Sequence, residues 1–246
     1  MIPKLIWRLA TGAVLTIVCC GCSGMKTQPQ REKPMMVNAS ETFDLSEPGD
    51  SWSFRTPNLW HLAQEADRHF LQMDAPPQRP LLPGVPRPQE YAIYRKYEFR
   101  SFNLSCRVRV DCEPSVAVRD AVVIFGRQDR THGYYLHLAN QSGDFHNTLV
   151  RLDGKTRRAL VPSGSLPPTA TDKAWHRVDI QRDADKGTIT VYFDYDERDP
   201  KPLLQITDRT YEWGFIGVGS FNDYASFGRV LIEGQARKPA HPLDMD

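Results

Sequence analysis

Residues 175–194 read WHRVDIQRDADKGTITVYFD and predict two short strands separated by a turn. Val178 and Ile180 alternate with charged residues, and residues 189–193 repeat this alternation after the turn signal at Gly187. Successive side chains of a strand point to opposite faces, so apolar residues at every second position indicate strands with one face on a hydrophobic core. The stretch therefore predicts a pair of antiparallel strands.

Similar segments recur along the second half of the chain, each bounded by turn signals. The predicted strands cover residues 121–126, 134–139, 148–152, 176–181, 188–193, 203–206, 214–219 and 229–232. Residues 102–110 also alternate between apolar and polar side chains and form a further predicted strand. Short strands at regular spacing indicate an all-β fold, a two-sheet antiparallel sandwich of the jelly-roll type.

The composition excludes several other classes of protein. A chain of 246 residues can bury a sizeable core, and its 31 Lys and Arg against 30 Asp and Glu give no electrostatic case for nucleic acid as a partner. Sixteen glycines and nineteen prolines are too many for a helical bundle, whereas 40% hydrophobic residues are too many for a disordered chain. Six of the prolines fall in residues 74–90, which we expect to form a surface connection.

The first residues have the features of an export signal. Lys4 and Arg8 flank the apolar stretch 9–20, which is too short to span a bilayer and is typical of a signal peptide. Residues 18–23, VCCGCS, resemble the bacterial lipobox, in which a small residue precedes a cysteine that is lipidated and becomes the new N-terminus. Cys22 fits this pattern best, because a glycine stands immediately before it.

The lipobox resemblance implies a location. It predicts an exported bacterial lipoprotein held in a membrane of the cell envelope through acylated Cys22, and Ser23 favours the outer membrane. Cys19 departs from the pattern, which prefers Leu there, and an ordinary secretory signal is the alternative. The expected organisation is a signal peptide at 1–21, a flexible tether at 22–40, one domain at 41–235 and a disordered tail at 236–246.

The mature chain keeps two cysteines, Cys106 and Cys112. Export favours disulfides, but both residues belong to the strand signal that begins at residue 102. Six residues of extended chain span about 20 Å, which is far more than a disulfide allows. We expect both thiols to be reduced, with Cys106 buried as a small apolar residue and Cys112 near the end of the strand.

Several runs of sequence resemble a known superfamily. The runs are VIFGRQD (123–129), YYLHLAN (134–140), WHRVDIQRD (175–183), GTITVYFD (187–194) and GVGSFND (217–223). Their order is similar to that of the concanavalin A-like lectin/glucanase superfamily, and within it to laminin-G-like domains and the domain family labelled 3-keto-disaccharide hydrolase. The likeness covers residues 43–234 and implies a two-sheet jelly roll. It leaves activity open, because this fold carries lectins, adhesion modules and glycosidases.

Strand parity indicates a candidate binding surface. If the apolar residues of each strand face the core, the opposite faces carry an unusual mixture of aromatic and polar side chains. The predicted carbohydrate-binding residues are Tyr135, His137, Trp175, Arg177, Asp179 and Tyr192. Aromatic rings stack on sugar faces, and the polar groups hydrogen-bond to hydroxyls. We therefore predict a noncatalytic, lectin-like domain whose partner is a carbohydrate.

Two other functions remain open from the sequence. A glycoside hydrolase needs two convergent carboxylates, and retaining glucanases of this superfamily place them on one strand as Glu-x-Asp-x-Glu. The nearest match, residues 194–197, indicates a solvated turn instead, so a hydrolase acting on a keto-disaccharide or glucan would need acids such as Asp129 and Asp223 to converge. A laminin-G-like adhesion domain would use a flat apolar patch to bind protein.

Calcium is the one cofactor that the sequence suggests. Many domains of the superfamily hold a structural calcium ion at the rim of the sandwich. Asp129, Asn222 and Asp223 are oxygen donors in predicted loops, which is the ligand type that calcium prefers. Tight turns also favour these residue types, so turn formation is the competing explanation.

Overall fold

The computed structural model describes residues 33–44, 49–74, 87–243 and 245. The predicted signal peptide, Cys22 and most of the proline-rich stretch lie outside these residues. In the described part of the chain, no helix is long and apolar enough to cross a membrane.

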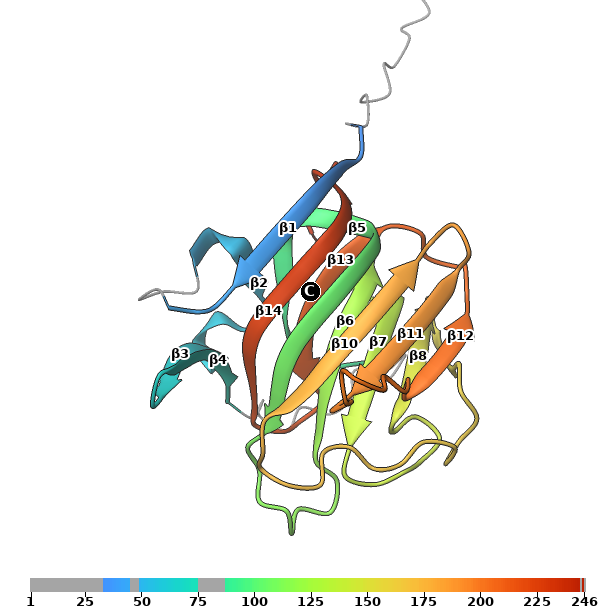
Figure 1. Ribbon diagram of the computed structural model, residues 1–246. Helices are drawn as coiled ribbons and strands as arrows, with labels where there is room; N and C mark the ends of the chain where they lie inside the picture. The colour runs from blue at the N-terminus through green and yellow to red at the C-terminus, as the bar shows by residue number, and fades with distance from the viewer. Residues whose placement is uncertain (1–32, 45–48, 75–86, 244, 246) are drawn as a thin grey trace, which may run out of the picture. The chain divides into compact units, whose positions relative to one another are not determined.

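Strands make up nearly all of the regular structure in the described residues (Figure 1). They are β1 (Met35–Glu41), β2 (Trp52–Phe54), β3 (Trp60–Glu65), β4 (Arg68–Met73), β5 (Glu90–Val110), β6 (Asp120–Arg127), β7 (His132–Ala139), β8 (Thr148–Asp153), β9 (Thr156–Ala159), β10 (His176–Asp183), β11 (Thr188–Phe193), β12 (Leu204–Thr207), β13 (Gly214–Ser220) and β14 (Ala225–Arg237). Two single-turn 3-10 helices, η1 (Gly49–Ser51) and η2 (Pro57–Leu59), flank β2.

The long strand β5 belongs to both sheets of a sandwich. Its first half, from Glu90 to Phe99, pairs with β2 and β13, and its second half, from Phe102 to Val110, pairs with β10 and β14. The back sheet has the order β2-β5-β13-β6-β7-β8-β9. The front sheet, which faces the viewer in Figure 1, has the order β1-β14-β5-β10-β11-β12, with β4 and β3 beside the start of β14. The pairings of the described strands are antiparallel, which confirms the predicted jelly-roll architecture.

One hydrophobic core fills the space between the sheets. The front sheet contributes Leu104, Val108, Val178, Ile180, Ile189 and Val191, and the back sheet contributes Val123, Phe125, Leu136, Leu138, Ile216 and Val218. Where β5 passes from one sheet to the other, Phe102 packs edge-on against Phe99 and Phe125, with ring centres 6.3 and 5.9 Å apart. Burial of each large apolar side chain contributes about 1.5–3 kcal/mol, so this crossing point is fixed by the core that it helps to form.

The outer faces of the two sheets differ. On the back sheet, Tyr135, Phe215 and Phe221 belong to a second apolar cluster that is almost fully buried, and Phe145 and Leu243 pack against it. From Arg177 to Gln181, β10 of the front sheet shows the predicted alternation, with Val178 and Ile180 inward and polar residues outward. The next inward residue, Arg182, is buried and donates a hydrogen bond of 2.8 Å to the carbonyl oxygen of Tyr211. The front sheet therefore presents polar side chains to solvent, whereas the back sheet has its outer face covered.

The strands predicted in the second half of the chain are confirmed as β6, β7, β8 and β10 to β14. The prediction of residues 229–232 found only the middle of β14. Pairing of β14 with β5 shifts register between Gly228 and Leu231 and again between Gly234 and Ala236, so the simple alternation is interrupted. Strand β9 was missed because its residues, TRRA, are polar and carry no apolar signal.

Both ends of the domain extend beyond the predicted limits of 41 and 235. Strand β1, Met35–Glu41, pairs with β14 from Ala236 to Val230, and its residues up to Ser40 were predicted to belong to the tether. Only Val37 and Ala39 pack toward the core, and two small inward residues are too weak a pattern to identify a strand. Ala236, predicted to lie in the disordered tail, is fully buried in β14.

The two thiols agree with the sequence prediction. Cys106 and Cys112 are both free, and Cys106 is buried in the core. Cys112 lies just beyond the end of β5, where burial raises the pKa of its thiol to about 11. Both therefore remain protonated thiols at neutral pH.

Close approach of β13 to β5 requires a glycine at position 219. A Cβ atom there would lie 2.2 Å from the carbonyl oxygen of Glu90 and 2.9 Å from the Cα atom of Tyr91, and neither backbone atom can move without disturbing the pairing. We expect Gly219→Ala to lower the free energy of unfolding by about 1–3 kcal/mol. Urea denaturation of the purified domain measures this loss.

Gly228→Ala is the matched control for this prediction. Its added Cβ would meet Trp175 at 3.6 Å, an ordinary van der Waals contact, so the free energy of unfolding should change by about 0.5 kcal/mol or less. Equal stability of the two variants would contradict the close approach of β13 to β5.

Candidate functional site

The residues predicted to form one sugar-binding surface are divided between the sheets. Arg177 and Asp179 lie on β10 and Tyr192 lies on the neighbouring β11, with their side chains on the outer face of the front sheet. Tyr135 and His137 lie on β7 in the back sheet. The outer faces of a sandwich point in opposite directions, because the inner faces pack on each other. The predicted six-residue surface is therefore not one site, and the front-sheet group is the candidate.

Four of the front-sheet side chains form a compact group that we call the tyrosine cluster: Arg177, Asp179, Tyr192 and Tyr195. Asp179 and Tyr192 are direct partners in the pairing of β10 with β11. Nε of Arg177 lies 2.7 Å from Oδ2 of Asp179, and its guanidinium lies 5.0 Å from the ring centre of Tyr195. The two tyrosine rings are 4.9 Å apart at 46°. The cluster thus combines two partly exposed aromatic rings with a fixed donor and a fixed acceptor.

The turn between β11 and β12 brings Tyr195 onto the sheet. Asp194 adopts a left-handed conformation with φ 43°, and its Oδ1 accepts a hydrogen bond of 2.7 Å from the backbone N–H of Arg177. Further along the turn, Glu197 hydrogen-bonds the Arg177 guanidinium and raises the pKa of that side chain. Sequence reasoning interpreted this segment as a solvated turn and missed Tyr195. The available signal was an aromatic residue two positions after the end of β11.

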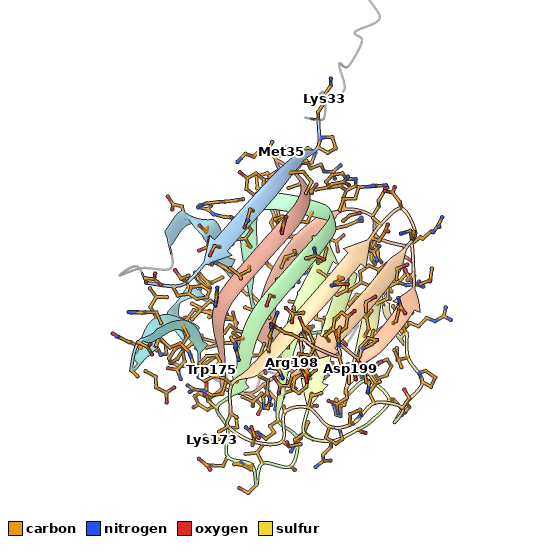
Figure 2. All side chains as sticks on the ribbon, in the orientation of Figure 1. Lys33, Met35, Lys173, Trp175, Arg198 and Asp199 are labelled. Atoms are coloured by element: carbon orange, nitrogen blue, oxygen red, sulfur yellow. The ribbon has the colours of Figure 1, made fainter. Side chains whose placement is uncertain are left out.

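Trp175 lies at the end of the front sheet where β10 begins (Figure 2). Its ring packs edge-on against Phe70 at 5.2 Å, and the guanidiniums of Arg109 and Arg68 lie 4.6 and 5.4 Å from the ring centre. These cation–π and aromatic contacts engage the ring with β4 and β5. Trp175 therefore serves the packing of the sheet edge and is not the open stacking platform that the sequence suggested.

Tyr135 and His137 are also unsuited to contact a ligand. They are 1% and 2% exposed in the covered apolar cluster of the back sheet. His137 stacks on Phe221 with ring centres 4.8 Å apart, and its Nδ1 donates a hydrogen bond of 2.6 Å to the carbonyl oxygen of Phe145. Parity correctly placed both residues on an outer face. It could not show that Phe145 of the β7–β8 loop and Phe221 of the β13–β14 turn would cover that face.

An open hollow of about 400 Å³ lies on the front sheet. Its lining comes from four strands and the β10–β11 turn, and its residues include Met36, Asn103, Asp183, Asp185, Glu233 and Gln235. Gln181 separates this hollow from Asp179 along β10, so the hollow and the tyrosine cluster share one sheet face. The sequence prediction missed the hollow, because its walls come from segments far apart in the chain.

The predicted acid pair and calcium ligands do not come together. Asp129 follows the end of β6 and is held by Thr131 and His132, whereas Asp223 hydrogen-bonds the backbone N–H of Asp120 at the start of β6. An eight-residue strand separates the two ends of β6 by about 23 Å. Asp129 and Asp223 therefore cannot act on one glycosidic bond, nor can they share one calcium ion with Asn222. Among the described residues, no group of three His, Cys, Asp or Glu side chains is placed to hold a metal.

Asp223 instead belongs to a buried network that ties the β13–β14 turn to β6. Its Oδ2 accepts a 2.8 Å hydrogen bond from the backbone N–H of Asp120, and its Oδ1 accepts one from the Cys112 thiol. Ser220 donates to Asp120 at 2.7 Å and accepts from the backbone N–H of Asp223. Burial, followed by repulsion from Asp120, raises the pKa of Asp223 to about 6. At Asp120, burial is outweighed by the His137 ring, whose Nε2 lies 3.4 Å from Oδ2, and by the hydrogen bonds from Ser220 and the Phe221 backbone, so the pKa of Asp120 is lowered.

Comparison of the sequence with protein-family models and with curated proteins finds no match. Comparison of the fold does find similar structures. The carbohydrate-binding module CBM66 from Bacillus subtilis superposes with a TM-score of 0.53 at 9% identity, over 75% of this chain and 96% of that one.

Two further neighbours have lower similarity. The exoplasmic/lumenal domain of VIP36, in a form bound to Ca²⁺ and Man3GlcNAc, gives a TM-score of 0.48 at 11% identity, over 74% of this chain and 83% of that one. A β-1,3-glucanase from Mycobacterium marinum gives 0.46 at 13% identity, over 79% and 97%. The strand order, with the CBM66 superposition, shows that this chain has the concanavalin A-like lectin/glucanase fold.

The raised pKa of Asp223 makes stability depend on pH in a definite direction. The folded state binds a proton at this carboxyl more tightly than the unfolded state does, so its contribution is largest below about pH 4 and is lost as pH rises through about 6. Asp223→Asn removes the charge and keeps the shape. We expect wild type to lose about 1–2 kcal/mol more than the variant between pH 4 and pH 7 in urea unfolding. Parallel pH profiles would contradict a raised pKa at Asp223.

Proposed function

We propose that this domain recognises a carbohydrate, without cleaving it, on the outer face of its front sheet. The observation that carries the proposal is the tyrosine cluster, in which two partly exposed rings stand beside an ion-paired Arg177 and Asp179. The open hollow on the same face gives a ligand room to extend. The superposition on a carbohydrate-binding module supports a fold suited to this role.

The chemistry of the cluster matches that of a sugar. The C–H face of a pyranose packs on an aromatic ring, while guanidinium N–H groups donate to hydroxyl oxygens and a carboxylate accepts from hydroxyl protons. Arg177 is already held by Asp179 and Glu197, so little side-chain freedom is lost when a ligand binds. A fixed polar pair beside two rings gives the orientation that sugar recognition requires.

The two alternatives have less support. Hydrolysis requires two carboxylates on either side of one glycosidic bond, and the acids considered from the sequence lie at opposite ends of β6. Protein adhesion requires a broad apolar patch. Among the described residues, Met35 and Met36 are large exposed apolar side chains at the start of β1. Val116 and Val118 are two more, but they lie in the β5–β6 connection, beyond the other end of the front sheet, so these four side chains do not make one patch.

We also propose that the domain acts at a bacterial membrane. The lipobox-like sequence at residues 18–23 supports acylation of Cys22, and acyl chains contribute about 0.8 kcal/mol per buried CH₂ to membrane binding. The polar residues between Cys22 and β1, which begins at Met35, give a tether that holds the sugar-binding face away from the lipid. Ser23 supports the outer membrane as the destination.

Removal of either ring of the tyrosine cluster should weaken glycan binding without unfolding the domain. A stacking ring contributes about 0.5–1.5 kcal/mol beyond the area that it buries, so Tyr192→Ala and Tyr195→Ala should each lower affinity by a few-fold to about tenfold. A glycan array identifies a ligand, isothermal titration calorimetry measures the affinity, and thermal melts confirm folding.

Tyr224→Ala is the matched control, because this exposed tyrosine lies in the β13–β14 turn, away from the cluster. Its affinity should equal that of wild type. Unchanged affinity in both cluster variants would remove this face as the binding site. Release of reducing sugar from the bound glycan by wild type would show a hydrolase.

Replacement of the predicted lipidated residue tests the location. Cys22→Ser removes the thiol that acylation requires, so the variant should no longer incorporate a fatty acid, and any chain cleaved after the signal peptide should leave the membrane fraction. Fractionation and labelling with a radioactive or alkyne fatty acid measure the change. If the variant still fractionates with the membrane and still incorporates the label, the prediction that Cys22 is acylated is wrong.

A further inference from the structure

We propose that the front sheet binds an extended, uncharged polysaccharide chain that runs across the strands along a single row of hydrogen-bonding side chains. This inference rests on the proposed carbohydrate binding and specifies the class of glycan and its direction on the sheet. It comes from the strand register, which aligns residues that are far apart in the sequence.

The row crosses all six strands of the front sheet. Its members, from β1 to β12, are Asn38, Glu233, Asn103, Gln181, Thr190 and Gln205, and each is the direct partner of the next across the pairings. We call these six residues the amide row. On each strand, a residue adjacent in sequence to the row member belongs to the core. Because successive side chains of a strand point to opposite faces, the row members lie on the outer face.

Five members of the row are exposed, and Thr190 lies buried between its neighbours. Within the described part of the chain, the five exposed side chains make no hydrogen bond to another residue. Some other surface amides are bound to backbone, as Gln64 is to Ala66 and Asn140 is to Val116. The row therefore offers donors and acceptors together, with side chains that are not held elsewhere in the fold.

The spacing of the row suits a chain of sugars. Neighbouring strands lie about 4.8 Å apart, so six strands give a row of about 24 Å. One pyranose ring adds about one strand spacing to the length of an extended β-linked chain. Successive sugars can thus meet successive strands, and each primary amide supplies both a donor and an acceptor to a hydroxyl pair.

The borders of the row specify an uncharged ligand. On one side lies the tyrosine cluster, since Tyr192 and Asp179 are two residues along their strands from Thr190 and Gln181. On the other side lies the hollow, in which Asp183 is ion-paired with Lys186 and Asp185 with Arg100. Glu233, an exposed carboxylate with no ion pair to another described residue, belongs to the row itself. The unpaired Glu233 carboxylate repels an acidic polysaccharide and accepts hydrogen bonds from neutral sugar hydroxyls, and the ion-paired acids of the hollow offset the positive charges of Lys186 and Arg100 there.

The twist of the front sheet favours binding of a single polysaccharide chain over binding of a crystalline polysaccharide surface. Adjacent strands of a sheet are rotated by roughly 20–25° relative to each other, so a row across six strands follows a twisted path. A single soluble chain can follow that path by small rotations at each linkage. A rigid crystalline face would meet only part of the row, so we expect soluble chains to bind better than crystalline polysaccharide.

Chain length gives the first test. The probes are disaccharides and hexasaccharides of the cello-, xylo-, chito-, laminari- and malto-series, titrated calorimetrically into the full mature chain. At least one β-linked hexasaccharide should bind about tenfold or more tightly than its disaccharide, because only the longer chain covers the row. Polygalacturonate, the acidic probe, should bind more weakly than that hexasaccharide. The inference is overturned if no hexasaccharide shows this gain, or if polygalacturonate binds best.

Substitution in the row gives the second test. Asn103→Ala combined with Gln181→Ala removes two central side chains and should lower hexasaccharide affinity about tenfold, with little change for the disaccharide. The control combines Asn58→Ala with Asn222→Ala, two exposed amides outside the sheet, and should match wild type. Thermal melts of both double variants establish that the fold is intact.

The outcomes separate this inference from the proposed function. If Tyr192→Ala weakens binding and the row variant does not, the face binds carbohydrate but the amide row is not its path. If neither changes affinity, both proposals fail. Light scattering tests the alternative that the front sheet binds a second copy of this chain instead of a glycan. A wild-type dimer that the row variant converts to a monomer would overturn the inference.

Discussion

The structure depends on one strand that serves two sheets. β5 pairs with β13 in the back sheet and with β10 and β14 in the front sheet, and its aromatic residues at the crossing point pack into the shared core. Because both sheets are fixed to this strand, the parity of every other strand is set relative to one core. A residue next to a core-facing residue on the same strand then points outward. The front-sheet surface is thus a consequence of core packing.

The sequence was sufficient to predict the type of fold and the parity of most strands, because apolar alternation is a local signal. Arg177, Asp179 and Tyr192 were correctly placed on an outer face for this reason. The sequence was not sufficient to predict which strands belong to the same sheet, since pairing joins segments that are far apart in the chain, such as β1 and β14. Tyr135 was therefore assigned to the wrong surface.

The sequence pattern of a strand also does not show whether other segments of the chain cover its outer face. The back sheet has aromatic and polar outward residues like the front sheet, but Phe145 and Phe221 pack over them. Ionisable groups there serve structure, as Asp120 and Asp223 show by closing a turn. The front sheet keeps unpaired amides in register instead. A rigid sheet that presents unpaired donors and acceptors loses little conformational freedom on binding, which favours recognition of a hydroxyl-rich chain.

The most direct test of this account is the NMR spectrum of the side-chain amide groups during titration with a bound hexasaccharide. The NH₂ signals of Asn103, Gln181 and Gln205 are assigned by substitution. The account predicts that these three signals shift together in a saturable way, while that of Asn58 stays constant. The absence of a shift in these three signals at a saturating concentration of the hexasaccharide would contradict it.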